Sequence, residues 1–153
     1  MVLTGSADNV SLPNTHHRCH LAHTQTIALW DLRRLGSKLH SFESHTAPVL
    51  QVIWSPHSPV HFASASEDRR VHIWNLGNIG AEQTPDDAED GPPELMFVHG
   101  GHTSQVSDLS WSPAEGSKWN LASTAEDNVL QIWEPSRHLR AAGEADVDAM
   151  DLE

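Results

Sequence analysis

The chain has 153 residues, with 21 acidic and 9 basic side chains and a formal net charge of −12 when histidine is neutral. This balance argues against a nucleic-acid-binding face, because phosphate contacts need clustered Lys and Arg. No apolar run is long enough to cross a membrane, residues 1–6 lack the features of a secretory signal, and the single cysteine, Cys19, allows no internal disulfide.

Short segments of alternating apolar residues predict strands. Residues 49–54 and 71–74 are rich in β-branched and aromatic side chains at strand-like spacing. Pro56 and Pro113 lie between such segments, where a missing N–H does not interrupt a ladder. Helices are excluded there because the segments are short and turn residues interrupt them. We therefore expect an all-β chain.

Parts of the sequence repeat each other. His45 and His102 each stand nine positions before a tryptophan that Ser-Pro follows. Asp68 and Asp127 each stand six positions before another tryptophan. A partial third copy precedes them, within residues 5–32. Several spacings agree at once, so a repeat architecture is indicated.

The repeats resemble WD40 repeats, whose hallmarks include Gly-His before a first strand and Trp-Asp at the end of a third, as in Gly101-His102 and Trp30-Asp31. The resemblance implies a partial β-propeller: two complete repeats and part of a third, from a seven-bladed parent. It also implies one buried hydrogen-bonded set per blade, which we interpret as structural, not as a hydrolytic triad, because the set recurs. The members would be His45, Ser64, Asp68 and Trp74 in one blade, and His102, Ser123, Asp127 and Trp133 in the next.

A narrower resemblance rests on residues 27–33, 39–45, 86–95 and 99–102. These segments are similar to the histone-binding WD40 family: retinoblastoma-binding histone chaperones, the chromatin assembly factor small subunit and the second subunit of type B histone acetyltransferase. The chain is identified as a C-terminal fragment of such a protein. The distinguishing element is an acidic Gly-Pro-Pro loop at residues 80–94, called the acidic loop below.

In that family the corresponding loop and an N-terminal helix enclose a site for the first helix of histone H4. By resemblance, two loop acids pair with histone arginine, two prolines stiffen the loop, two apolar residues flank the floor of the site, and one acid contacts the H3 tail on another face. Carboxylates three positions apart can accept charge-assisted bonds from Arg. The implied histone-binding residues are Asp87, Glu89, Asp90, Pro92, Pro93, Leu95, Phe97 and Glu126.

The resemblance implies a non-catalytic scaffold that chaperones histone H4, with H3, for acetyltransferase, deacetylase or chromatin assembly complexes. Its expected location is the nucleus and also the cytoplasm, with no cofactor, no metal, no direct nucleic-acid contact and no membrane. Three alternatives remain: another WD40 adaptor, such as a ubiquitin ligase substrate receptor; a nonfunctional truncated product; and a metal-assisted hydrolase that uses the histidine-rich segment at residues 16–23. That segment fits no ordered zinc motif.

Residues 10–25 form an atypical insertion. Removing them restores the six-position spacing between Asp8 and Trp30, and the bounding residues can be encoded by intron-like ends, which suggests a retained intron translated in frame. The expected organisation is a partial blade at 1–9 and 26–44, the insertion at 10–25, a repeat at 45–101 that contains the acidic loop, a repeat at 102–135, and a short helix with an acidic disordered tail at 136–153.

Overall fold

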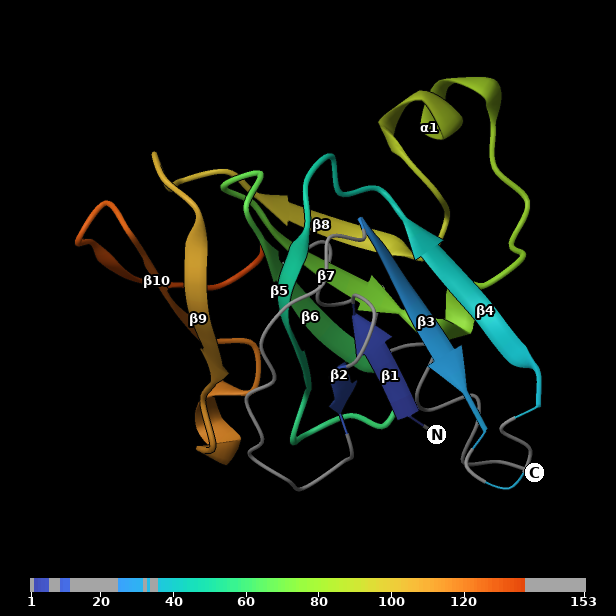
Figure 1. Ribbon diagram of the computed structural model, residues 1–153, viewed down its shortest axis with the longest axis horizontal. Coiled ribbons are helices and arrows are strands. Elements are labelled where there is room, and N and C mark those ends of the chain that lie inside the picture. Colours follow the sequence, from blue (N-terminus) through green and yellow to red (C-terminus); the bar gives the residue numbers. More distant parts are fainter. Residues whose placement is uncertain (1, 6–8, 12–24, 32, 34–35, 137–153) are drawn as a thin grey trace.

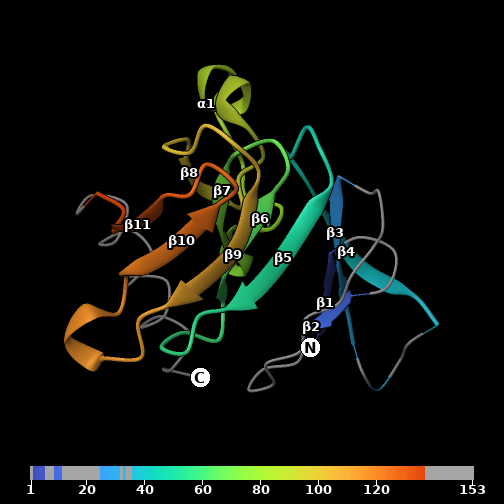
Figure 2. The same ribbon diagram turned by 60° about the vertical axis from the view of Figure 1, so that its left-hand side comes forward.

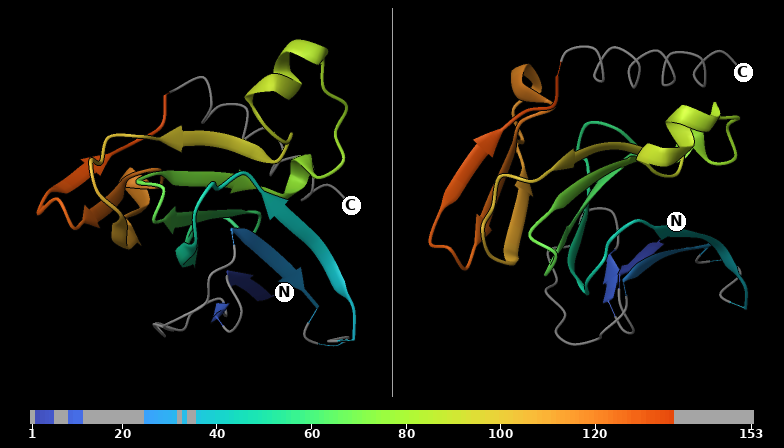
Figure 3. Two further views of the ribbon diagram at one scale, coloured as in Figure 1. Left: turned by 45° about the horizontal axis from the view of Figure 1, so that its top comes forward. Right: turned by 90° about the horizontal axis from the view of Figure 1, so that it is seen from above.

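A computed structural model describes residues 2–5, 9–11, 25–31, 33 and 36–136. In this part the chain forms three antiparallel sheets that lie side by side and are inclined to one another (Figure 1; Figure 3). The all-β fold class predicted from the sequence is confirmed, and the three sheets lie side by side as expected for part of a β-propeller. The first sheet holds β1 (Val2–Gly5), β2 (Asn9–Ser11), β3 (Thr26–Trp30) and β4 (Lys38–Glu43); the second holds β5 (Val49–Trp54), β6 (His61–Ser66), β7 (Val71–Asn75) and β8 (Leu95–His99); the third holds β9 (Val106–Trp111), β10 (Leu121–Ala125) and β11 (Leu130–Trp133).

Two apolar clusters hold the three sheets together. The first lies between the first and second sheets and contains Ile27, Phe42 and Trp74. The second lies between the second and third sheets and contains Ile73 and Trp111. The middle sheet is therefore covered on both faces, and every residue of β6 and β7 is buried. Burial of β3 alternates along the strand, as expected for one covered face.

The hairpin that leads into each blade tryptophan has the same register in all three sheets. The residue three positions before each tryptophan is Ile27, Val71 or Leu130. These residues face Gly5, Ala65 and Thr124, respectively. β1 and β3 thus pair as they would if residues 10–25 were absent. β2 lies beside β1, in the sheet position that β5 and β9 hold elsewhere. Residues 12–24 lie outside the described part, so the retained intron stays a hypothesis.

In the described residues, β11 is the edge of a three-stranded sheet, and Leu130 and Ile132 are 61% and 72% exposed. Figure 2 shows this sheet beside the middle one, with α1 (Pro85–Asp90) projecting from the second sheet. Two short 3-10 helices complete the elements, Leu76–Asn78 and Glu115–Ser117. No helix among the described residues has the length and apolarity needed to span a bilayer. The predicted C-terminal helix and acidic tail lie outside these residues, apart from Ser136.

Candidate functional site

The blade hydrogen-bond set of the middle sheet is a continuous chain of bonds. Trp74 Nε1 donates to Ser64 Oγ at 2.9 Å, and Ser64 Oγ lies 2.7 Å from His45 Nε2. His45 Nδ1 lies 2.8 Å from Asp68 Oδ2. An ionised carboxylate only accepts, so Nδ1 carries the proton and Nε2 accepts from the serine hydroxyl. Burial raises the pKa of Asp68, but hydrogen bonds from His45 and from backbone N–H groups outweigh it and leave that pKa below its usual value.

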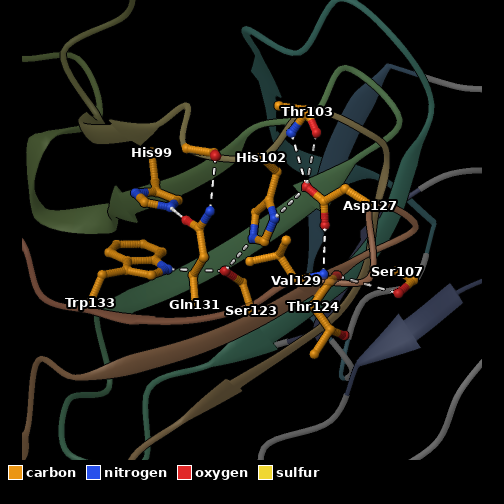
Figure 4. A network of polar contacts seen from close by, with 11 residues as sticks. His99, His102, Thr103, Ser107, Ser123, Thr124, Asp127, Val129, Gln131 and Trp133 are labelled. Atoms are coloured by element: carbon orange, nitrogen blue, oxygen red, sulfur yellow. Dashed lines mark hydrogen bonds and ion pairs between the residues drawn. The ribbon is translucent and has the colours of Figure 1, made fainter.

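The third sheet repeats this arrangement (Figure 4). Trp133 Nε1 donates to Ser123 Oγ at 3.0 Å, Ser123 Oγ lies 2.7 Å from His102 Nε2, and His102 Nδ1 lies 3.3 Å from Asp127 Oδ2. The backbone N–H of Thr103 donates to the same carboxylate at 3.0 Å and, as the largest cause, lowers the pKa of Asp127. In both sheets these bonds join the residues that the WD40 resemblance implied for the blade hydrogen-bond sets.

The Ser-His-Asp order of these sets matches that of a hydrolytic triad, but the geometry is structural. Ser64 and Ser123 are buried, so no substrate carbonyl can approach their hydroxyls. Each hydroxyl oxygen also accepts an indole N–H. The sets satisfy buried polar groups inside the blades instead.

In the described part of the chain, one group could hold a metal ion by its residue types: His45, Asp68 and His72, whose ligand atoms lie within 4.8 Å of one another. The rings of His45 and His72 are stacked, with centroids 3.7 Å apart and planes 6° apart. Zinc lies close to the plane of each imidazole that binds it, at about 2.0–2.1 Å from the nitrogen. A single ion cannot lie in two parallel planes this far apart, so the trio does not form a metal centre. The histidine-rich segment at residues 16–23 lies outside the described part.

The acidic loop contains a short capped helix, α1. Thr84 is its N-cap: its hydroxyl accepts from the backbone N–H of Asp87 at 3.2 Å and donates to the Asp87 carboxylate at 2.6 Å. Pro85 occupies the first turn, where a missing N–H costs nothing. Asp87 and Asp90 therefore lie three positions apart on a helix, on neighbouring points of one face. A threonine followed directly by proline and, three positions after the threonine, by an acid is a helix-start signal. Thr84, Pro85 and Asp87 form this signal and could have revealed α1 from the sequence.

All residues of α1 are exposed, and it carries four carboxylates and no basic side chain. Acids in the first turn interact favourably with the positive end of the helix dipole, but Glu89 and Asp90 lie in the last turn, beside the negative end. Like charges three or four positions apart also repel. A cationic partner would relieve both costs, so the electrostatics of the helix favour a basic ligand.

The end of the acidic loop is tied to the blades. Gly91 has φ +134°, and a Cβ there would lie 2.9 Å from Leu95 Cδ2. The backbone N–H of Leu95 donates to the Pro92 carbonyl at 2.9 Å and closes a turn that contains Pro93 and Glu94. The projecting helix therefore stands on a closely packed turn. We did not predict the contacts of Glu94 from the sequence.

The remaining predicted site residues do not all gather at this loop. Leu95 packs against the first cluster, whereas Phe97 packs against the second and contacts Trp133. A bulge in the β7–β8 pairing, where Ile73 faces Phe97 but Trp74 faces Leu95, separates the two side chains. The two side chains therefore contact different apolar clusters. Glu126 is exposed in the turn after β10, in another sheet.

Comparison with known proteins identifies the repeats. The family model described as WD domain, G-beta repeat, matches residues 36–75 and 93–134. Over 120 residues the chain is 41% identical to a protein of Debaryomyces hansenii named Histone acetyltransferase type B subunit 2. The alignment covers 74% of this chain and 28% of that relative, so the chain spans little more than a quarter of the relative's length. The resemblance to histone-binding WD40 proteins inferred from the sequence is confirmed.

Proposed function

Because this chain belongs to the WD40 repeat family, we propose that it is a non-catalytic scaffold whose acidic loop binds a basic segment of histone H4. It would hold H4, with H3, for acetyltransferase, deacetylase or chromatin assembly subunits, in the nucleus and during passage through the cytoplasm. The name of the 41% identical relative supports a link to a histone acetyltransferase complex.

The observation that carries the proposal is the exposed, purely acidic helix α1 on a closely packed turn. Long-range attraction between this helix and a basic segment would speed encounter. Direct bonds from arginine to Asp87 and Asp90 would then fix the register. A preformed loop lowers the ordering cost of binding, and Pro92 and Pro93 contribute to that order.

The two aspartates have different roles. Asp87 also holds the N-cap through Thr84, whereas the Asp90 side chain forms no hydrogen bond or ion pair with another described residue. Replacing Asp87 by alanine would therefore remove both a binding charge and a helix cap. Asparagine is the better substitution, because its amide oxygen can still accept from the Thr84 hydroxyl. Glu89 would add to the negative electrostatic field of α1 without forming a bond to one particular histone residue.

The test is binding of a fluorescent peptide of the H4 first helix to the 153-residue chain, measured by anisotropy at moderate salt. We expect the Kd to rise by about tenfold for D87N plus D90N, a change of roughly 1.4 kcal/mol. The affinity of the unmodified chain should also fall as salt increases, since exposed charges are screened.

The matched control is E43Q plus E115Q, which removes two exposed carboxylates outside the acidic loop and changes the net charge equally. We expect this variant to bind like the unmodified chain. An equal loss in both double variants would mean that only net charge attracts the peptide. Absence of binding by the unmodified chain would refute the proposal for this chain.

A further inference from the structure

We infer that His40 and Glu94 pin the end of the acidic loop to the neighbouring blade and act as positioning residues for the proposed histone site. His40 Nε2 donates to Glu94 Oε1 at 2.8 Å. The two residues are 54 positions apart: His40 lies on β4 of the first sheet, and Glu94 directly precedes β8 of the second. The positioning role rests on the proposed function. The effect of the His40–Glu94 hydrogen bond (the His40–Glu94 pin) on the order of the acidic loop can be tested without it.

Glu94 is held from two directions. Its side chain is only 6% exposed, so the bond to His40 replaces water that the carboxylate would otherwise contact. Its carbonyl accepts from the backbone N–H of Asn75 at 2.9 Å. The Asn75 side chain caps the 3-10 helix that follows β7, by accepting from Gly77. Asn75 therefore joins the segment before the acidic loop to the end of the loop, and His40 ties that junction to the next sheet.

His40 is well placed to serve as a fixed anchor. Its ring packs edge-on against Phe42, with centroids 4.7 Å apart. Phe42 is fully buried and contacts Phe62 and Trp74 in the cluster between the first two sheets. The imidazole thus stands on the interface between blades, and the position of the acidic loop depends on the packing of that interface.

Loss of His40 would leave a buried carboxylate without its side-chain donor. A charge in this state is costly, and the response that costs least is for Glu94 to turn outward to water. The turn that contains Pro92 and Pro93 would move with it, and so would the helix that carries Asp90. A residue that touches no histone would then control histone affinity through the order of the loop.

The test combines hydrogen–deuterium exchange of the full 153-residue chain with the peptide-binding measurement. In H40A we expect exchange of amides in residues 84–91 to rise by about tenfold or more, while β6 and β7 keep their protection. We expect the Kd for the H4 peptide to rise severalfold. In H40Q the amide nitrogen can still donate to the carboxylate, so both changes should be largely reversed.

The matched control is H57A. His57 Nε2 donates to the Ser112 carbonyl at 2.8 Å and also connects two sheets, but neither residue of this bond belongs to the acidic loop. This variant should lose a similar amount of stability without changing exchange in the loop. Unchanged loop exchange in H40A, or an equal rise in H57A, would overturn the inference. If the unmodified chain does not bind H4, the proposed function fails, and loop exchange in H40A still decides whether the pin exists.

Discussion

The imidazole rings of His45 and His72 lie parallel, with centroids 3.7 Å apart, although their surroundings differ. His45 uses both ring nitrogens in the blade hydrogen-bond set. His72 is 1% exposed, and neither of its ring nitrogens has a hydrogen-bond partner among the residues that the structure describes. Burial, and then the neighbouring His45, lower the pKa of His72 from 6.5 to about 3. His72 is therefore neutral in the folded chain at mildly acidic pH.

This difference predicts that acid destabilises the fold through His72. Between its folded pKa of about 3 and its unfolded value of 6.5, the unfolded chain binds a proton that the folded chain does not. The free energy of unfolding should thus fall as pH decreases below 6.5, by up to about 1.4 kcal/mol per pH unit. The carboxylates of Asp68 and Asp127 have lowered pKa values, so their contribution is lost only when pH falls toward 3.8 and below.

The variant H72Q isolates this effect, because Gln131 occupies the same position in the third blade, two residues before the tryptophan. Urea unfolding of both proteins between pH 4.5 and 7 gives the comparison. We expect the pH dependence of the unmodified chain to be steeper by the amount due to His72. Parallel curves would show that His72 binds its proton equally well in the folded and unfolded chains.

The two blade hydrogen-bond sets should differ in their contribution to stability. S64A leaves His45 Nε2 and Trp74 Nε1 unpaired inside the most buried sheet, and we expect a loss of about 2–4 kcal/mol. S123A should cost about 1–2 kcal/mol, because Trp133 is half-buried and water can reach its surroundings. Urea unfolding followed by tryptophan fluorescence measures both values. A larger loss for S123A would contradict the burial argument.

The sequence predicted the hydrogen-bond sets that recur from blade to blade, but it did not predict contacts that occur only once. The WD40 resemblance implied both blade hydrogen-bond sets, because His45 and His102 each stand nine positions before a tryptophan and Asp68 and Asp127 each stand six positions before another. The pin between His40 and Glu94 has no such signal, since it joins residues of two sheets that are 54 positions apart. Separation of Leu95 from Phe97 depends on a local bulge, which alternation does not predict.

Deletion of residues 10–25 should leave the first hairpin intact. Gly5 faces Ile27 in the register that Ala65 and Val71 share, so the shortened turn would match the one in the middle blade. Shortening the connection about fourfold gains roughly 1 kcal/mol in loop-closure entropy, against loss of the β2 pairing with β1. We expect cooperative unfolding with a free energy within about 1 kcal/mol of the unmodified chain. Loss of cooperativity would show that the segment is needed for the fold.

The order of the acidic loop should also depend on Gly91. Its φ of +134° is strained for any residue with a Cβ, and that atom would meet Leu95 Cδ2 at 2.9 Å. In G91A we expect a loss of about 1–3 kcal/mol in stability, faster amide exchange in residues 84–91, and weaker binding of the H4 peptide.

Gly100 provides the control for this substitution, because a Cβ there meets nothing within 4 Å. G100A should therefore unfold and bind like the unmodified chain, since no neighbouring atom would have to move. If G91A instead kept the loop protected, Leu95 would have yielded to the added methyl group. The turn that supports α1 would then depend on the Leu95–Pro92 hydrogen bond and not on close packing at Gly91.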